Sequence, residues 1–415
     1  MIERTTLRAA AWCLFLMFPF GVIGVLASSG SASELRAVEA NGTDSSDLDR
    51  AIGNATGYLM HSASADGKLL YQVDTMSGAS APLYNVVRHA GVIASLGMLD
   101  GDLCSPEVKR SILSLAKYMK RNYVGPGLHA EQVAVWSEPF PRAGELKLGA
   151  TGLGLVALLK ARHIDERIVS LGELQGLART LVYLQKPDGS FVEMYRPGLG
   201  PDLNWHAPFY PGEAALALVS LYKVDHNPEW LASACKALAY LARSRARSAV
   251  VPEDHWALIA TAELIQYCDE KACIATRQEL INHAVQICNE LLRMQQIVPD
   301  NPTLDGSFDP LGHPAIAGAA LEGLLAAYEF LPDDQKVLRT RIKVAASRGV
   351  VFLMRAQIKS GPYTGGMPLT AGPSESGTVI IRIDFVQHAL SAWIRYRKLF
   401  GSALQDAKQS VSPLN

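Results

Sequence analysis

The chain has 415 residues, of which 49% are hydrophobic and 19% are charged, and its formal net charge at pH 7 is −1. This composition allows a large buried core, and the length fits either two domains or one large repeat domain. No run of lysine and arginine is interleaved with aromatic residues, which argues against nucleic acid as a partner.

The N-terminus has the pattern of a secretory leader. Two arginines precede an uncharged, apolar run at residues 9–27, and small residues follow it. We therefore expect residues 1–32 to be a signal peptide, residues 33–46 to be a linker, and the mature domain to be periplasmic or secreted. An uncleaved leader would be long enough to anchor the domain in the membrane, facing outside the cytoplasm.

Five of the six cysteines lie outside the predicted leader, which is an odd number. Cys268 and Cys273 flank a short turn and could form a small disulfide, although two free thiols fit the sequence equally well. No Cys-x-x-Cys pair or His-x-x-x-His spacing accompanies them, so we expect no metal site and no cofactor.

Helical periodicity dominates the chain after the linker. Apolar positions spaced three and four residues apart predict twelve helices, at 47–61, 82–99, 105–122, 148–162, 168–186, 209–224, 227–245, 253–268, 272–296, 314–330, 333–357 and 380–400. We expect one domain over residues 47–402 and a flexible tail over residues 403–415.

The predicted helices alternate between two kinds, which indicates an internal repeat. The odd-numbered helices carry charged residues along one stripe, whereas the even-numbered helices are rich in Ala, Gly and Leu, as at 150–159 and 315–325. Small residues permit close packing on both sides. Six consecutive hairpins can close into a barrel of six inner and six outer helices, an all-α (α/α)6 toroid; an open superhelical stack is the alternative.

At this level the chain resembles the α/α-toroid families: six-hairpin glycosidases, polysaccharide lyases, sugar epimerases, and the terpenoid-cyclase and prenyltransferase group. Residues 185–191 (Gln-Lys-Pro-Asp-Gly-Ser-Phe) are similar to the repeated Gln-x-x-x-Gly-x-Trp element of terpenoid cyclases, with looser echoes from Gln296 and from Gln357. The Asp-x-Asp-Asp and Asp-Asp-x-x-Asp motifs of those enzymes are absent. We therefore interpret the element as shared hairpin architecture.

The connections that precede the even-numbered helices are long, at 62–81, 123–147, 187–208 and 358–379, whereas most of those that follow them are short. Long loops in a compact domain usually carry function, and helix N-termini favour anions or developing negative charge. We therefore expect a ligand cleft at the face that these loops form, called the long-loop face below.

Candidate site residues come from all parts of this face. The catalytic candidates are Glu213, Asp254, Asp384, His89 and His255. The substrate-binding candidates are Tyr84, Arg88, His129, Glu131, Trp205, Tyr210, Trp256, Arg382 and His388. Asp384 and His388 are four residues apart, so they share a helix face and could pair. Structural explanations also exist, because an acid in a first turn stabilises a helix and His89 could be a core histidine.

Two reaction types fit these residues. Glycoside hydrolysis uses a pair of carboxyl groups, for which Glu213, Asp254 and Asp384 are candidates. Lyases and epimerases abstract a proton next to a carboxylate with Tyr or His, while Arg neutralises the acid group. The sequence favours an exported carbohydrate-active enzyme with hydrolase-like acid–base chemistry on a polysaccharide or oligosaccharide. The alternatives are a uronate lyase or epimerase, a non-catalytic glycan-binding or envelope-assembly protein and, least favoured, a terpenoid-cyclase-like enzyme.

Overall fold

The computed structural model of the protein describes residues 45–80, 83–142, 144–372 and 379–410. The predicted leader and nearly all of the predicted linker lie outside the described residues. The described part of the chain contains twelve α-helices, and each predicted helix has a counterpart among them.

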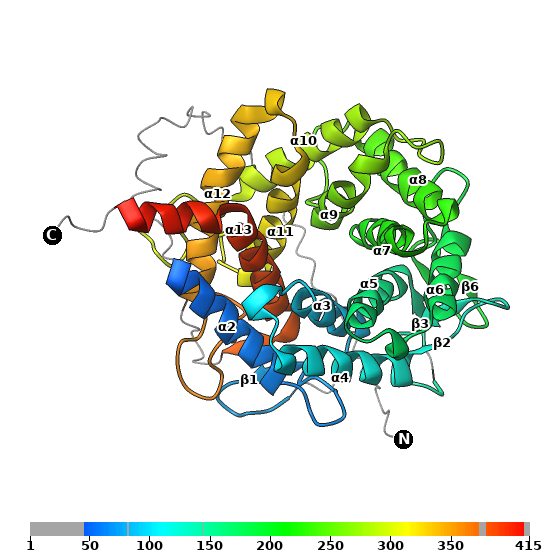
Figure 1. The fold of residues 1–415 in the computed structure, drawn as a ribbon, viewed down its shortest axis with the longest axis horizontal. Helices are drawn as coiled ribbons and strands as arrows, with labels where there is room; N and C mark the ends of the chain where they lie inside the picture. The colour runs from blue at the N-terminus through cyan, green and yellow to red at the C-terminus, as the bar shows by residue number, and fades with distance from the viewer. Residues whose placement is uncertain (1–44, 81–82, 143, 373–378, 411–415) are drawn as a thin grey trace, which may run out of the picture.

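The helices form two concentric layers (Figure 1). The inner helices are α3 (Val86–Leu96), α5 (Leu148–Ile164), α7 (Tyr210–Asp225), α9 (His255–Leu264), α11 (Pro314–Phe330) and α13 (Ile383–Ser410). The outer helices are α2 (Ser45–His61), α4 (Pro106–Tyr123), α6 (Leu171–Leu184), α8 (Pro228–Arg245), α10 (Arg277–Met294) and α12 (Lys336–Ala356). Each inner helix packs against the next, and α13 packs against α3. The ring is closed, so the predicted (α/α)6 toroid is confirmed over the open stack.

The composition of each layer explains its place. In the inner helix α5, every residue from Leu148 to Leu158 is buried, because Gly, Ala and Leu pack well on all sides. The outer helix α4 instead buries one stripe that includes Val108, Ile112 and Met119, and it leaves its charged residues in water. Ser105 caps the start of α4 by accepting a hydrogen bond from the Val108 backbone N–H.

Short strands lie in the long connections. The strands are β1 (Gln72–Asp74), β2 (Val124–Pro126), β3 (Val133–Val135), β4 (Leu146–Lys147), β5 (Met194–Arg196), β6 (Gly200–Pro201) and β7 (Ile380–Arg382). β1 pairs antiparallel with β7 and β2 with β3, while β4, β5 and β6 form a three-stranded sheet. The β1–β7 pair joins the first long loop to the last one. It therefore closes the toroid at the long-loop face.

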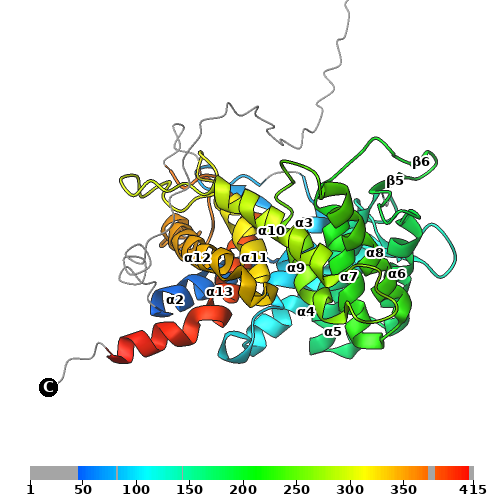
Figure 2. The ribbon, with the colours of Figure 1, turned by 90° about the horizontal axis from the view of Figure 1, so that it is seen from above.

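The long connections leave the toroid on one side (Figure 2), where the β5–β6 hairpin and the loop between α10 and α11 both project. The connections on the opposite side are mostly short and contain the 3-10 turns η1 (Gly101–Leu103), η2 (Glu166–Ile168), η3 (Ile265–Tyr267) and η4 (Asp333–Gln335). The predicted asymmetry between the two faces is thus present in the fold.

Glutamines at the ends of outer helices bind the next outer helix. Their Nε2 atoms donate to backbone oxygens as follows: Gln185 to Ser233 (3.0 Å), Gln295 to Ala345 (2.9 Å) and Gln357 to Ala51 (2.9 Å). In the second of these bonds, the glutamine is Gln295, whereas the sequence pattern suggested its neighbour Gln296. These bonds are structural, in agreement with the interpretation of the repeated element as hairpin architecture.

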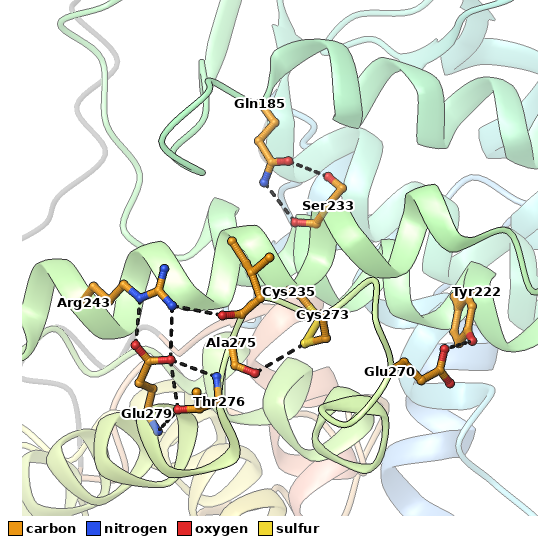
Figure 3. Close-up of a disulfide and its surroundings, with 11 residues drawn as sticks. Gln185, Tyr222, Ser233, Cys235, Arg243, Glu270, Cys273, Ala275, Thr276 and Glu279 are labelled. Carbon is orange, nitrogen blue, oxygen red and sulfur yellow. Dashed lines mark hydrogen bonds and ion pairs between the residues drawn. A yellow bond between two sulfur atoms is a disulfide. The ribbon is translucent and has the colours of Figure 1, made fainter.

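Cys273 forms a disulfide with Cys235 of α8, with Cα atoms 5.2 Å apart (Figure 3). The suggested pairing of Cys273 with its neighbour Cys268 is therefore wrong, and Cys268 is a free thiol. The physical reason is tertiary: Arg243 of α8 donates to the Ile274 backbone oxygen (3.0 Å), which holds this segment against α8.

The last helix, α13, continues to Ser410. It therefore runs beyond the predicted end at residue 400 and includes residues 403–410 of the segment predicted to be a flexible tail. Within the described ranges, no helix combines the length and apolar content needed to cross a membrane.

Candidate functional site

Two arginines hold one carboxylate where α3 and α13 begin. Arg382 donates from Nε to Asp384 Oδ1 (2.6 Å) and from Nη2 to Oδ2 (2.9 Å), and Arg88 Nε lies 3.0 Å from the same Oδ2. The Arg88 and Arg382 side chains are 31% and 26% exposed, whereas the Asp384 side chain is only 10% exposed. Both carboxylate oxygens are therefore engaged, and the cluster presents a net positive charge. This geometry supports the predicted binding role of the arginines and does not support a catalytic role for Asp384.

His388, Glu322 and His255 form a row across α13, α11 and α9, in which Glu322 and His255 are buried and His388 is partly buried. His388 Nδ1 lies 2.7 Å from Glu322 Oε2, and His255 Nε2 lies 3.8 Å from the same oxygen. The predicted partner of His388 was Asp384, but the structure pairs it with Glu322. Because an ionised carboxylate only accepts hydrogen bonds, Nδ1 of His388 carries the hydrogen and its Nε2 is left for other chemistry. The His388 side chain is 17% exposed.

His255 differs from His388 in its hydrogen bonding. Its Nε2 atom is buried and has no hydrogen-bond partner among the described residues. A buried polar atom without a partner costs free energy and calls for an explanation, such as a functional role. His255 also contacts the Phe209 ring, with centroids 5.1 Å apart.

The two histidines are driven toward opposite protonation states. Burial lowers the pKa of His255 well below its ordinary value, and the adjacent His388 lowers it further. Burial also acts to lower the pKa of His388, but the Glu322 carboxylate outweighs burial, and the pKa of His388 is raised. Environments that separate the pKa values of two groups are typical of sites where one group takes a proton and the other gives one.

Two glycines of α11 allow this close arrangement. A Cβ atom on Gly318 would lie 2.8 Å from the Cβ atom of His388, and one on Gly323 would lie 2.9 Å from the Cβ atom of His255. Side chains at these positions would therefore push both imidazoles away from Glu322. The small residues of this inner helix thus serve the site as well as the packing of the toroid.

The same three residues could also hold a metal ion. Among the described residues, His255, Glu322 and His388 form a group whose ligand atoms all lie within 4.8 Å of one another. Two histidines and one glutamate are a known zinc set. However, tetrahedral ligands at zinc–ligand bond lengths lie about 3.3 Å apart, whereas the His388–Glu322 separation of 2.7 Å is that of a hydrogen bond. We therefore treat the row as an acid–base cluster, and the expected absence of a metal stays a prediction.

Aromatic residues flank the row. The Trp256 ring lies 5.1 Å from the His255 ring and is buried, so it packs the imidazole in place. Trp205 and Tyr210 form a second pair near the start of α7, with ring centroids 5.4 Å apart, and both are partly exposed. Of these three predicted substrate-binding residues, Trp205 and Tyr210 are thus partly accessible, and Trp256 is not.

Glu213 lies in the first turn of α7 and is buried. Its Oε2 atom has no hydrogen-bond partner within the described chain. Burial raises the pKa of Glu213 well above its ordinary value, and the negative charge of Asp254 raises it further. Burial therefore favours the protonated form of Glu213, and its catalytic role stays a prediction.

Asp254 caps the start of α9. Its Oδ1 accepts a hydrogen bond from the Ala257 backbone N–H (3.0 Å), and its Oδ2 lies 3.0 Å from Arg245 Nη1. Burial raises the pKa of Asp254, against the opposing effect of Arg245. Because the side chain is completely buried and both oxygens are used, the geometry supports the capping role rather than the catalytic one.

His89 is fully buried and bonded through both ring nitrogens. Its Nδ1 lies 2.6 Å from the Tyr84 hydroxyl, and its Nε2 lies 3.0 Å from the Leu115 backbone oxygen. Since a carbonyl oxygen only accepts, Nε2 donates and Nδ1 accepts from Tyr84. Burial lowers the pKa of His89 to about 4. The structure therefore supports the core-histidine explanation for His89 and gives Tyr84 the role of its partner.

His129 and Glu131 lie away from the row, on the outside of the toroid. The His129 ring packs against the Tyr183 ring of α6 at 4.6 Å, and the Glu131 backbone oxygen accepts from Arg179 Nε (3.0 Å). The β2–β3 hairpin folds back onto the outer layer because Thr180 Oγ1 donates to the Val133 oxygen (2.7 Å). Nothing in this geometry supports substrate binding by either residue.

Three contributors were not selected from the sequence: Glu322, Tyr71 and Phe209. Glu322 had a readable signal, since it is an acid in the middle of an apolar helix, where an unpaired charge is costly. Tyr71, whose hydroxyl accepts a hydrogen bond from Arg88, lies in a loop and gave no signal.

Comparison with known protein families and with curated protein sequences finds no match. The fold, in contrast, is similar to solved structures. A cellobiose 2-epimerase from Spirochaeta thermophila matches with a TM-score of 0.64 at 12% identity, covering 89% of this chain and 100% of that one. A sugar epimerase from a ruminal bacterium matches with a TM-score of 0.60 at 13% identity, covering 86% and 99%.

A GH76 α-mannanase from Bacteroides thetaiotaomicron matches with a TM-score of 0.58 at 11% identity, covering 88% of this chain and 99% of that one. The predicted resemblance to the six-hairpin α/α-toroid group is therefore confirmed at the level of the fold. At these identities the similarity shows the fold alone, and the reaction has to be argued from the site.

Proposed function

We propose that the protein is an exported sugar-acting enzyme that transfers protons at a carbon atom, as an epimerase or isomerase does. The observation that carries the proposal is the His388–Glu322–His255 row, in which burial and one carboxylate shift the pKa values of two imidazoles in opposite directions. Acid–base catalysis by positioned histidines is the common way to remove and return such protons.

In the proposed reaction, neutral His255 takes the proton from the carbon next to a sugar carbonyl or carboxylate. The electron pair of the broken C–H bond moves toward the neighbouring oxygen. Protonated His388, held by Glu322 through Nδ1, returns a proton from Nε2. No other reactant is needed, because one proton leaves the substrate and one returns.

The positive charges of Arg88 and Arg382 would stabilise the negative charge that this reaction creates on a substrate oxygen. Arg88 and Arg382 are partly exposed and fixed by Asp384, so they are oriented before a ligand arrives. Such preorganised cations stabilise an oxygen that becomes negative in the transition state. They would also bind the carboxylate of a uronic acid.

The site supports hydrolysis less well. Hydrolysis requires two carboxyl groups placed on either side of the scissile bond. Of the three carboxylates selected from the sequence, Asp384 is engaged by two arginines, Asp254 caps a helix, and Glu213 is buried. Two of the similar structures named above are epimerases and the third is a mannanase. These names agree with a glycan as the ligand.

Export is supported by the leader-like N-terminus and by the Cys235–Cys273 disulfide, since such bonds persist in oxidising compartments. The test is fractionation of cells that make the full chain, followed by mass spectrometry of the alkylated protein. We expect an oxidised chain in the periplasm or the medium. A reduced chain in the cytoplasm would contradict export, and a membrane-bound chain outside the cytoplasm would indicate an uncleaved leader.

The test of the reaction is incubation of the mature protein with neutral and uronic-acid oligosaccharides in deuterated water. Deuterium at one carbon without cleavage is the expected result, and it should be absent in His388→Asn. New reducing ends would indicate hydrolysis, and ultraviolet absorbance of an unsaturated uronate would indicate a lyase. Binding without any of these changes would support a non-catalytic protein. Activity that disappears with a chelator and returns with zinc would favour the metal alternative.

A further inference from the structure

A hollow of about 420 Å³ lies beside the candidate site, and its wall includes Tyr71, the residue before β1. Its wall includes Ser64, Lys68, Leu70, Tyr71, Leu83 and Tyr84. Aromatic and aliphatic side chains with a few polar groups are the usual lining of a small-molecule site. Neither the proton-transfer row nor the arginine pair lies in this wall, so the hollow needs an explanation of its own.

Tyr71 lines the hollow and also contacts the candidate site. Its hydroxyl accepts a hydrogen bond from Arg88 of α3, and its backbone oxygen accepts from the N–H of Ile383 at the start of α13 (3.2 Å). Its ring lies 5.6 Å from the Tyr84 ring. A ligand that fills the hollow would therefore lie next to a sugar bound at Arg88.

Lys68 places a positive charge in the hollow. Its ammonium nitrogen lies 5.7 Å above the centre of the Tyr84 ring. The Tyr84 hydroxyl is fixed by the Leu69 N–H (3.3 Å) and by His89 (2.6 Å), so the ring is a rigid support. Among the described residues, no carboxylate lies within 4.0 Å of the Lys68 ammonium group. The charge is therefore positioned by the ring and available to an anion.

A second hollow of about 450 Å³ continues along the same loop toward α4. Its wall includes Asp66, Arg110, Leu113, Ser114, Lys117 and Arg121. Arg110 pairs with Glu107 and Arg121 with Asp66, at 2.6 Å and 3.5 Å. Lys117 has no carboxylate within ion-pair distance in the described part of the chain. Each hollow thus carries one lysine that has no carboxylate within 4.0 Å among the described residues.

We infer that the two hollows are accessory subsites for successive acidic units of an anionic glycan, whose reacting unit lies at Arg88 and Arg382. The first hollow adjoins the arginine pair through Tyr71, and the segment that contains Asp66 and Lys68 contributes to the walls of both hollows. An uncharged glycan would leave these cations without partners. The inference deepens the proposed function and rests on it for the position of the reacting sugar.

The test is calorimetric binding of defined oligomers to the full-length mature protein. The probes are the dimer, trimer and tetramer of galacturonic acid and of mannuronic acid, together with neutral galactose and mannose oligomers of the same lengths. Lys68→Met and Lys117→Met remove charge and keep most of the side chain. Lys336→Met is the matched control, because Lys336 is exposed at the start of α12, on the face opposite the long loops.

We expect at least one acidic series to bind more tightly with each added unit, and the neutral series to show no such gain. Lys68→Met should weaken binding of the acidic trimer about tenfold, as expected for the loss of one charged hydrogen bond. Lys117→Met should act in the same way on the tetramer alone, and Lys336→Met should change nothing.

Binding that is independent of length, equal for neutral and acidic oligomers, absent for both acidic series, or weakened equally by Lys336→Met would overturn the subsites. The result is separate from the proposed reaction. If acidic oligomers bind more tightly with length but no deuterium is taken up, the proposed reaction is wrong and the subsites are supported. If deuterium is taken up but binding does not depend on length, the reaction is supported and the subsites are wrong.

Discussion

His89 on α3 and His388 on α13 are both histidines on inner helices, and each follows a charged residue of the arginine cluster within four residues. His89 is fully buried, and His388 is partly buried. They differ in what their ring nitrogens contact. His89 satisfies both nitrogens with the Tyr84 hydroxyl and the Leu115 oxygen. His388 gives one nitrogen to Glu322 and faces His255, whose Nε2 has no partner among the described residues.

The difference separates two uses of a buried polar side chain. A histidine with two satisfied nitrogens specifies packing, and burial keeps it neutral. A histidine beside a carboxylate keeps a raised pKa inside the protein and can exchange a proton. Hydrogen bonding therefore distinguishes His89 from the two histidines that we propose to be catalytic.

The largest effect should come from His388→Asn. Asparagine can still donate to Glu322 but cannot exchange a proton, so turnover of the sugar that the panel identifies should fall about 10³-fold. The measurement is the initial rate of deuterium uptake. The melting temperature should stay within a few degrees, and His163→Asn, at an exposed position, should keep the wild-type rate. An unchanged rate in His388→Asn would remove His388 from the reaction.

The converse substitution, His89→Ala, should act on stability. It leaves a cavity and removes the partners of the Tyr84 hydroxyl and the Leu115 oxygen, which should lower the free energy of unfolding by about 3 kcal/mol. Urea denaturation followed by circular dichroism measures this loss. Turnover per folded molecule should be unchanged. Lost turnover with full stability would reverse the roles assigned to His89 and His388.

Glu322→Gln should test whether the carboxylate sets the protonation of His388. Without the carboxylate, the pKa of His388 should fall, because the negative charge that outweighs burial is gone. The proposed turnover requires protonated His388, so the alkaline limb of the pH–rate profile should move to lower pH. The rate at alkaline pH should fall about tenfold for each unit by which the pKa falls. The matched control is Glu329→Gln, an acid of the same helix whose carboxylate pairs with Arg395 (3.4 Å). An alkaline limb that does not move would contradict the assignment.

The smallest effect concerns stability and pH. The pKa of His89 is about 4 in the folded protein and about 6.5 for an ordinary histidine. Unfolded chains therefore bind more protons between these values, so this stabilisation is complete above about pH 6.5 and is lost as the pH falls toward 4. Between pH 7 and 5.5 the loss from His89 should be about 1 kcal/mol.

Urea titrations of wild type and His89→Ala at both pH values measure this difference. The wild type should lose more stability than the variant, because the variant no longer contains the titrating group. Equal losses in the two proteins would mean that folding does not lower the pKa of His89.

Much of the fold could be predicted because it depends on local patterns. Apolar spacing predicted all twelve helices, and the Gly- and Ala-rich segments were correctly assigned to the inner layer because only small residues pack closely on all sides. The unequal loop lengths predicted the long-loop face. The end of α13 was predicted too early, and helix ends are weakly specified by sequence.

The site was predicted less well, since its contacts join distant parts of the chain. Arg88, Arg382, His255 and His388 were among the candidates because charged and imidazole groups are rare on apolar helices. Their partner Glu322 was missed, and Asp384 was paired with His388 on spacing alone. His129 and Glu131 were misplaced because the β2–β3 hairpin folds back onto α6.

The sequence by itself determined the periodicity, the repeat of six hairpins and the end of the toroid that carries the reactive side chains, because each of these follows from spacing along the chain. Only the tertiary structure decided that His89 is structural, that His255 and His388 share one carboxylate, and that Cys273 bonds with Cys235. Hydrogen bonds and a disulfide between separate helices depend on distances in space, and ring closure sets those distances.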